Sequence, residues 1–368
     1  MKTMTLPTSK FQDMVSRAAK GASENKLIAI TSMICIELKN NVLTLTTTDT
    51  ANYLQVIADK IEGDDMYAVV NVDLFSKLIA KMTSESITIK MTDSSLEVKG
   101  NGTYNIPLET DEDGPVQYPM YKFEKTGEPE LVHLTSIKNI VAINKAAVAK
   151  SFETPCLCGY YAGNRIITTD GDVICFNDTK LFKEPALISP EMMSLLSLNT
   201  EEKINCYRNN GAFLFETPNI VVYGVEHDGL DLFPVDEIES YLDEEFASMC
   251  KVPKMLMQNV VDRLALFIDQ YDNNGAYFTF TQEGIKVQSK KSSSVELIAY
   301  QESKNFSPFM CCVDIPLLRE QIDANPGESL ELWYGHEAAI KITSGKVTQV
   351  ISLLEDEAIA ADGDSEQA

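Results

Sequence analysis

The chain repeats one pattern three times along its 368 residues. A helix-like run opens each third, and a second helix-like run follows later in the same third. The first runs are Ser9–Lys20, Ser136–Lys150 and Pro253–Asp269, and the second are Asp73–Met82, Pro190–Asn199 and Asp314–Asp323. Stretches that alternate apolar and polar residues fill the intervals. The repeat, of about 120 residues, is far longer than a solenoid unit. Each copy is therefore predicted to be a domain.

The first third shows how each domain is expected to be built. Thr8-Ser9 after Pro7 offers a helix cap, and Phe11, Met14, Val15 and Ala18 then form one apolar stripe. Two strand-like runs follow, Leu27–Leu38 and Val42–Leu54, joined by a turn rich in asparagine. The pattern predicts an α+β fold in which each domain packs two helices on antiparallel sheets.

Shifts in composition mark the boundaries between the domains. Glu109–Glu130 and Glu226–Lys251 are acidic, lack periodicity and are interpreted as linkers. The last residues, from Glu355 on, are acidic and small, which is typical of a disordered tail. We predict domains at residues 1–122, 123–245 and 246–355, followed by a disordered tail at 356–368.

Hydropathy and cysteine usage indicate a cytoplasmic protein. No run reaches the 18 or so apolar residues that a membrane-spanning helix needs, so no membrane partner is expected. The start, Met1–Pro7, lacks the apolar stretch of a secretory signal. The eight cysteines show no disulfide-framework spacing and are predicted to be buried free thiols in a reducing cytosol.

Charge is distributed unevenly. The formal net charge is −24, but the six helix-like runs together hold eleven Lys and Arg against eight Asp and Glu. In the first two thirds the basic residues also recur at spacings of four or seven, which places them on one side of a helix. Lys10 and Arg17 are such a pair. Ordinary solvated helix faces are the alternative reading, and the runs at Pro190–Asn199 and Asp314–Asp323 are net acidic.

Catalytic and metal-binding patterns do not emerge. The three histidines, His133, His227 and His336, lie one per domain, far from the i, i+4 spacing of a helical zinc site. No C-x-x-C pair, phosphate-binding loop or nucleophile elbow is present. Asp49 and Asp170 follow threonine runs in equivalent places, which predicts a shared turn rather than a carboxylate pair. We expect a protein without enzymatic activity, cofactor or metal.

Several segments carry a resemblance to a known family. Asn41–Leu54 (NVLTLTTTDTANYL), Phe75–Met82, Leu96–Gly102 and the Thr-Asp-Gly turn at 169–171 resemble bacterial DNA polymerase sliding clamps, the β subunit of DNA polymerase III. Length and helix positions match across nearly all of residues 1–355. Two departures from the family pattern suggest a divergent member, such as one encoded by a phage or a plasmid. Asp172-Val173 replaces the family's basic pair, and Leu353-Leu354 with an acidic tail replaces a Met-Pro-Met-Arg-Leu-like end.

The resemblance implies a head-to-tail homodimer whose six domains form a ring. Such a ring encircles double-stranded DNA without regard to sequence and tethers the replicative DNA polymerase for processive synthesis. A separate clamp loader would supply the NTPase activity. The residues then expected to face DNA are Lys10, Arg17, Lys20, Lys77, Lys81, Lys138, Lys145, Lys150, Lys254 and Arg263.

The resemblance also implies a pocket between the second and third domains for clamp-binding peptides of polymerase, loader and repair proteins. Its expected residues are Leu157, Thr169, Gly171, Ile174, Val350, Ser352 and Leu354. Plain strand core is the alternative interpretation of the apolar members. A structural or adaptor protein that uses the same triplicated fold without encircling DNA remains the competing function.

Overall fold

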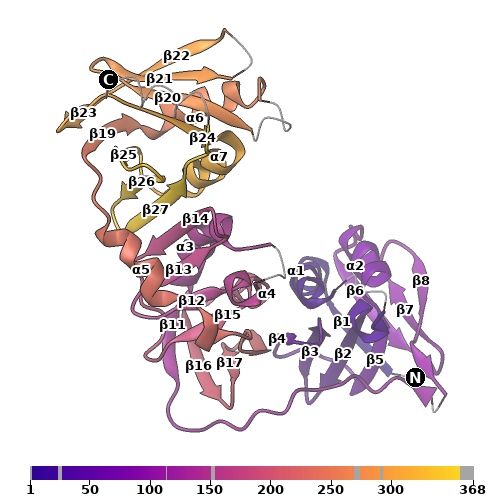
Figure 1. Cartoon of the computed structure of the whole chain (residues 1–368). Coiled ribbons are helices and arrows are strands. Elements are labelled where there is room, and N and C mark those ends of the chain that lie inside the picture. Colours follow the sequence, from indigo (N-terminus) through magenta and orange to yellow (C-terminus); the bar gives the residue numbers. More distant parts are fainter. Residues whose placement is uncertain are drawn as a thin grey trace. The chain divides into compact units, whose positions relative to one another are not determined.

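The computed structural model (Figure 1) describes residues 2–23, 27–112, 114–150, 154–268, 274–290 and 293–356. The chain forms two compact units. Unit 1 holds Met1–Ile137 and Glu191–Glu226, and unit 2 holds Lys138–Pro190 and His227–Ala368. The second sequence repeat contributes to both units, because its strands continue sheets of the repeats before and after it.

All six helix-like runs contain a helix, and each helix follows a strand with at most one residue between them. The first helix of each repeat comes from the pairs β1 (Lys2–Pro7) and α1 (Thr8–Ala18), β11 (Glu130–His133) and α3 (Leu134–Asn144), and β19 (Ser248–Pro253) and α6 (Lys254–Leu264). The second comes from β5 (Met66–Asn71) and α2 (Val72–Ala80), β15 (Ala186–Ile188) and α4 (Pro190–Leu196), and β24 (Phe309–Asp314) and α7 (Ile315–Ala324). The predicted α+β class with a repeated strand–helix plan is confirmed.

Unit 1 contains a four-stranded and an eight-stranded antiparallel sheet. The first has the order β1-β6-β7-β8, with β6 at Ser86–Met91, β7 at Ser95–Lys99 and β8 at Thr103–Pro107. The second has the order β11-β16-β17-β18-β4-β3-β2-β5. Its further strands are β2 (Met33–Lys39), β3 (Val42–Thr48), β4 (Asn52–Ala58), β16 (Lys203–Asn209), β17 (Ala212–Glu216) and β18 (Ile220–Val225). The short strands β9 (Thr110–Asp111) and β10 (Gly114–Pro115) pair with each other.

Unit 2 contains a nine-stranded sheet and a four-stranded sheet. The larger has the order β15-β12-β13-β14-β27-β26-β25-β19-β23 and the smaller β22-β21-β20-β24. Their further strands are β12 (Tyr160–Ala162), β13 (Ile166–Thr169), β14 (Val173–Asn177), β20 (Gly275–Phe280), β21 (Gly284–Ser289), β22 (Val295–Ala299), β23 (Glu302–Lys304), β25 (Ser329–Tyr334), β26 (Ala339–Ser344) and β27 (Val347–Ser352).

Repeats are joined by direct strand pairing. β4 of the first repeat pairs antiparallel with β18 of the second, from Val56↔Ile220 to Asn52↔Gly224. β14 of the second pairs antiparallel with β27 of the third, from Val173↔Ile351 to Asn177↔Val347. The last strand of the second repeat and that of the third thus each extend a sheet of the repeat before. Each junction is a hydrogen-bonded ladder rather than a loose hinge.

In the first and third repeats the two helices pack against each other over an apolar core. In the first repeat the rings of Phe11 on α1 and Phe75 on α2, both fully buried, meet edge to face with centroids 5.8 Å apart. The Gln12 side chain donates to the carbonyls of Ile79 and Met82 at the end of α2. In the third repeat Gln258 occupies the same place on α6 and donates to the carboxylate of Asp323 on α7.

Turns explain two features of the sequence. The asparagine-rich turn is confirmed, since Asn40 and Asn41 adopt φ of 52° and 63°, a region that asparagine tolerates. The run Val42–Leu54 is two strands rather than one, because Asp49 accepts hydrogen bonds from the backbone of Ala51 and Asn52 and closes a turn. Asp170 does the same for Asp172 and Val173, as the repeated position of the two aspartates predicts.

The second linker contains a helix that our sequence interpretation omitted. α5 (Val235–Asp243) lies within the stretch 226–251. Val235, Ile238 and Leu242 fall at i, i+3 and i+7 and pack on one apolar cluster. Asp236 and Glu237 occupy its first turn, where the helix dipole favours negative charge.

At the chain's end, residues 357–368, which make up most of the predicted tail, lie outside the described residues. Asp356 is described and forms an ion pair with Lys290, its oxygen 2.6 Å from the lysine nitrogen. Among the helices described, none combines the length and apolar character required to cross a lipid bilayer.

Candidate functional site

The basic residues predicted on the first repeat divide into paired and unpaired groups. Arg17 binds Asp13 at 2.8 Å and Lys77 binds Asp73 at 2.7 Å, each one turn away on its own helix. The second group extends into solvent without a carboxylate at ion-pair distance in the described part of the first repeat. It consists of Lys10, Lys20 and Lys81.

The second repeat presents three exposed lysines. Lys138 lies on α3, Lys145 begins the short helical turn after it, and Lys150 follows. Lys150 lies 3.8 Å from Glu320 of the third repeat, but its side chain is 81% exposed, so this pair is weak. No ion pair joins Lys138 or Lys145 to any carboxylate that the structure describes.

The two candidates of the third repeat have structural partners. The Lys254 ammonium donates to the carbonyls of Asp323 and Asn325, and so caps the C-terminal end of α7. Arg263 binds Glu296 of β22 through two nitrogens. The partners lie more than 30 residues away in sequence, so their contacts could not be predicted from local pattern.

Lys10, Lys20, Lys81, Lys138 and Lys145 are therefore the candidates whose charge no described carboxylate offsets. Each is a long, mobile side chain on or beside a helix. Such ammonium groups attract phosphate without fixing its position or reading base sequence, and salt weakens the attraction.

The predicted partner pocket maps to the β14–β27 junction. Ile174 and Val350 are direct partners across this ladder and belong to one buried cluster. Leu157, half-buried in the helical turn Pro155–Cys158, packs on the same cluster. The chain thus brings together apolar side chains that lie far apart in sequence.

Polar members of the predicted pocket form the adjoining turn. Gly171 adopts φ of +100°, and its N–H donates to the hydroxyl of Thr169, which is buried. Ser352, at the end of β27, donates its N–H to the carbonyl of Asp172. Six of the seven candidates therefore meet around β13, β14 and β27.

Leu354 is placed differently from the other six. Its N–H donates to the carbonyl of Cys312 on β24 at 2.9 Å, and its side chain lies beside Gly275 on β20. Leu354 is therefore part of the packing of the third repeat.

The linker around α5 adds residues that the sequence interpretation missed. Phe233 stacks on Tyr161 with ring centroids 4.9 Å apart, and Ile238 is buried in the cluster of Ile174 and Val350. Lys341 of β26 lies over the ring of Phe246 and donates to the Leu242 carbonyl, and burial lowers the pKa of its ammonium. The apolar spacing of α5 was the available signal.

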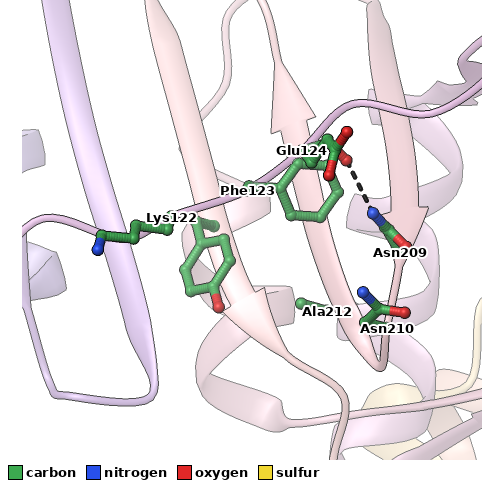
Figure 2. Close-up of a pocket in the computed structure, with 7 residues that line it drawn as sticks. Lys122, Phe123, Glu124, Asn209, Asn210 and Ala212 are labelled. Carbon is green, nitrogen blue, oxygen red and sulfur yellow. Dashed lines mark hydrogen bonds between the residues drawn. The ribbon is translucent and has the colours of Figure 1, made fainter.

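A separate cavity of about 420 Å³ lies where the first linker passes β16–β18 (Figure 2). It is lined by Lys122, Phe123, Glu124, Asn209, Asn210, Ala212 and Tyr223. Figure 2 shows the side-chain amide of Asn209 bonded to the backbone of Glu124, at 2.9 Å. None of the predicted site residues lines this cavity.

The cysteine thiols are poorly suited to act as nucleophiles. All eight cysteines are free and buried, and burial raises the pKa of Cys35 and Cys175 to about 12, so the nucleophilic thiolate is scarce at neutral pH. No group of three or more His, Cys, Asp or Glu side chains is arranged to hold a metal ion among the residues described.

Comparison with known proteins identifies the fold. No protein-family model and no curated protein sequence matches the chain. Solved structures do match over nearly the whole length. The DNA polymerase sliding clamp of Bacillus subtilis aligns with a TM-score of 0.84 at 17% identity, covering 96% of this chain and 99% of that one.

Two further structures agree. The DNA polymerase III β subunit of Thermotoga maritima gives a TM-score of 0.85 at 15% identity over 97% and 100% of the two chains. That of Borrelia burgdorferi gives 0.85 at 16% over 96% and 98%. The chain has the fold of the bacterial DNA polymerase III β sliding clamps.

Proposed function

We propose that the chain is a DNA sliding clamp without catalytic activity. Two copies join head to tail into a closed ring around double-stranded DNA. A partner surface at the β14–β27 junction tethers the replicative polymerase, so that synthesis is processive. The observation that carries the proposal is the pattern of paired and open strand edges within the chain.

Equivalent strands close the junctions inside the chain. The edge strand β4 of the first repeat pairs with β18, the last strand of the second, and the edge strand β14 of the second pairs with β27, the last strand of the third. One last strand and one strand equivalent to β4 and β14 remain at sheet edges. They are β8, which ends the first repeat, and β22, the third-repeat equivalent of β4 and β14.

The two open edges are complementary. Among the described strands, β8 pairs only with β7 and β22 only with β21. Large apolar side chains are exposed along them, with Tyr104 43%, Val295 44% and Leu297 50% exposed. An open strand edge with apolar residues is a template for pairing with another chain. Pairing β8 of one copy with β22 of the next is a heterologous contact, and two such contacts close a dimeric ring.

The charge distribution supports a sliding role. Five lysines on the helices or the turns after them have no carboxylate at ion-pair distance in the described structure, whereas the chain as a whole carries a net charge of −24. Scattered ammonium groups give a weak, sequence-independent attraction to phosphate that permits sliding, and acidic surfaces elsewhere repel DNA. Retention would then come from ring closure rather than from tight binding.

The apolar cluster at β14–β27 supports a peptide-binding role. Leu157 remains half-buried above Ile174 and Val350, so an apolar anchor of a partner peptide would find a side chain to contact. Polymerase, clamp loader and repair proteins would share this surface through short clamp-binding peptides.

The oligomeric state tests the proposal. The full chain should have a solution mass of twice 40.9 kDa, and the double variant Val295→Asp, Leu297→Asp should be a folded monomer. Leu266→Asp, at a more exposed apolar residue (78% exposed) outside the edge strands, is the control and should remain dimeric. A wild-type chain that is monomeric or forms open polymers would instead favour the adaptor function.

A further inference from the structure

The chain leaves each of the three repeats by the same pair of backbone hydrogen bonds. After β8, Leu108 donates to Ser94 and Glu109 to Val69, at 3.1 and 2.9 Å. After β18, Glu226 donates to Gly211 and His227 to Leu187, at 2.8 and 2.9 Å. After β27, Leu353 donates to Ala338 and Leu354 to Cys312, at 2.8 and 2.9 Å. The acceptors hold equivalent positions, since Val69, Leu187 and Cys312 each lie two residues before the residue that precedes a helix.

The first linker then crosses the face of the sheet opposite the core. Tyr118 donates its hydroxyl to the Met33 carbonyl of β2, and Tyr121 contacts Tyr53 of β4. Beyond the junction Tyr121 stacks on Tyr223 of β18, and Lys125 binds Glu216 of β17 at 2.6 Å. The linker follows the sheet order β2, β4, β18, β17 and so fastens both repeats together.

The second linker follows the equivalent route in unit 2. Phe233 stacks on Tyr161 of β12, and Ile238 packs with Ile174 of β14 and Val350 of β27. Past that junction, the carbonyl of Leu242 accepts from Lys341 of β26. Both internal junctions are thus covered by the segment that follows the repeat.

The C-terminal segment begins along the same route. Two residues after the bond of Leu354 to β24, the carboxylate of Asp356 accepts a hydrogen bond from the Tyr277 hydroxyl of β20 at 3.2 Å. The same carboxylate binds Lys290, the residue after β21. Tyr277 alternates with the buried Phe278, so the contact lies on the face opposite the core. The sheet order is β24, β20, β21, β22. The segment is therefore directed toward the open edge β22.

We propose that residues 357–368 complete a third strap, which crosses the junction between subunits and lies on the partner copy's sheet β1-β6-β7-β8. The inference rests on the proposed head-to-tail ring. It assigns to the acidic tail the role that the two linkers have inside the chain, at the one junction where no covalent linker exists.

Length and charge fit this occupant. Twelve residues in extended form span about 40 Å, enough to pass β22 and four partner strands spaced about 4.8 Å apart. The tail contains four acidic residues and no basic one. On the receiving sheet, the face opposite the buried Leu96 and Val98 presents the half-buried Lys90 and Lys99, which share the carboxylate of Glu97 at 3.7 and 3.2 Å. The two lysines share one carboxylate, so they can also pair with carboxylates of the acidic tail.

Subunit exchange between differently labelled full-length dimers tests the strap. Deleting residues 357–368 should speed exchange about tenfold at low salt, as expected for a few screened ion pairs, and the difference should shrink at high salt. Lys90→Glu with Lys99→Glu should speed exchange equally in the full chain and add nothing to the deletion. Lys183→Glu with Lys346→Glu, at exposed sites outside the two sheets that the strap would cross, is the matched control and should leave exchange unchanged.

Crosslinking identifies the surface that the tail contacts. A photoreactive p-benzoylphenylalanine at Ile359 should crosslink to β6–β8 of the other subunit, distinguished by isotope labelling. Crosslinks confined to the same subunit would overturn the strap and leave the clamp proposal intact. The same holds if the dimer is stable and its exchange rate is unchanged by the deletion. A monomeric full-length chain would overturn both.

Discussion

The rings of Tyr121 and Tyr223 stack with their centroids 4.6 Å apart and their planes 5° from parallel. Tyr121 belongs to the linker after the first repeat, and Tyr223 lies on β18 at the junction with the second. Tyr53, on the facing strand β4, contacts both rings edge to face. The aromatic contacts fasten the linker over the ladder that joins two repeats.

Removing the stacked ring should weaken this junction. Tyr121→Ala should destabilise unit 1 by about 2 kcal/mol, since it loses a stacked pair and the apolar area that the ring buries. Tyr121→Phe keeps the stack and loses only the hydroxyl bond to Gln55, so its cost should stay below about 1 kcal/mol. Urea unfolding of the full chain, with the exposed Met120→Ala as control, measures both. Equal losses for Ala and Phe would contradict the stacking account.

Asp314 should make the third repeat sensitive to pH. It caps α7 by accepting from Leu317, but burial raises the pKa of its carboxyl above the ordinary value of 3.8. The folded state then binds the proton more tightly than the unfolded state. The stability from Asp314 is therefore full below the unfolded pKa and is lost as pH rises through the folded pKa.

Asp314→Asn should remove that loss and keep the cap, because asparagine caps helices as well as aspartate does. The variant should be more stable than the wild type at pH 7, by up to about 1 kcal/mol, and the gap should close near pH 3. Asn71 already holds the equivalent cap of α2, accepting from Leu74 at 3.0 Å. Thermal unfolding at both pH values is the measurement, and a wild type that is the more stable of the two at pH 7 would refute the assignment.

Thiol reactivity should report global unfolding. All eight cysteines are buried, and burial raises the pKa of Cys206 and Cys250 to about 12. Ellman's reagent at pH 8 should react with the native chain only as it opens and should release eight equivalents in urea. Ser16→Cys, at an exposed position of α1, provides a positive control that should react at once. Rapid native labelling of any original cysteine would show that its site is accessible.

The partner surface can be tested separately from the ring. Leu157→Asp places a charge on the apolar cluster at β14–β27 and should reduce affinity for a clamp-binding polymerase peptide at least about tenfold. Leu232→Asp, at a 75% exposed apolar residue nearby in the linker, is the matched control. Isothermal titration measures the affinity, and solution mass verifies that the dimer persists. Undiminished peptide binding would place the pocket elsewhere.

The exposed lysines on and shortly after α3 in the second repeat should govern interaction with DNA. The triple variant Lys138→Glu, Lys145→Glu, Lys150→Glu should shorten retention on DNA and reduce its salt dependence, because three attractive charges become repulsive. Its folding should be unchanged, since these side chains are exposed. Lys183→Glu, Lys286→Glu and Lys346→Glu provide an equally charged control at exposed sites outside the candidate set. Identical retention of both triple variants would remove these lysines from the DNA-facing set.

Sequence predicted the fold where its signals were local. The stripe of Phe11, Met14 and Val15 specifies a helix by spacing alone, and the repeated Asp49 and Asp170 specify turns by hydrogen bonds within three residues. α5 was missed because its many acids outweighed three correctly spaced apolar residues in our interpretation.

The roles of individual site residues depended on contacts that no local pattern encodes. Lys254 looked like any helix lysine, yet its ammonium caps the end of α7 some 70 positions later in the chain. Leu354 looked like the end of a strand, yet its N–H bonds to Cys312 of β24. This bond precedes the ion pair of Asp356 with Lys290 two residues later. Such long-range partners follow only from the folded structure.

Retention on circular and linear DNA tests the central claim most directly. The full chain would be placed on a nicked circular duplex with a clamp loader or by mechanical opening of the ring. The account predicts that it stays on circles at high salt and leaves once the DNA is cut and the ends are free. Loss from circular and linear DNA at the same salt concentration would mean that binding is only electrostatic, and would contradict a ring that encircles DNA.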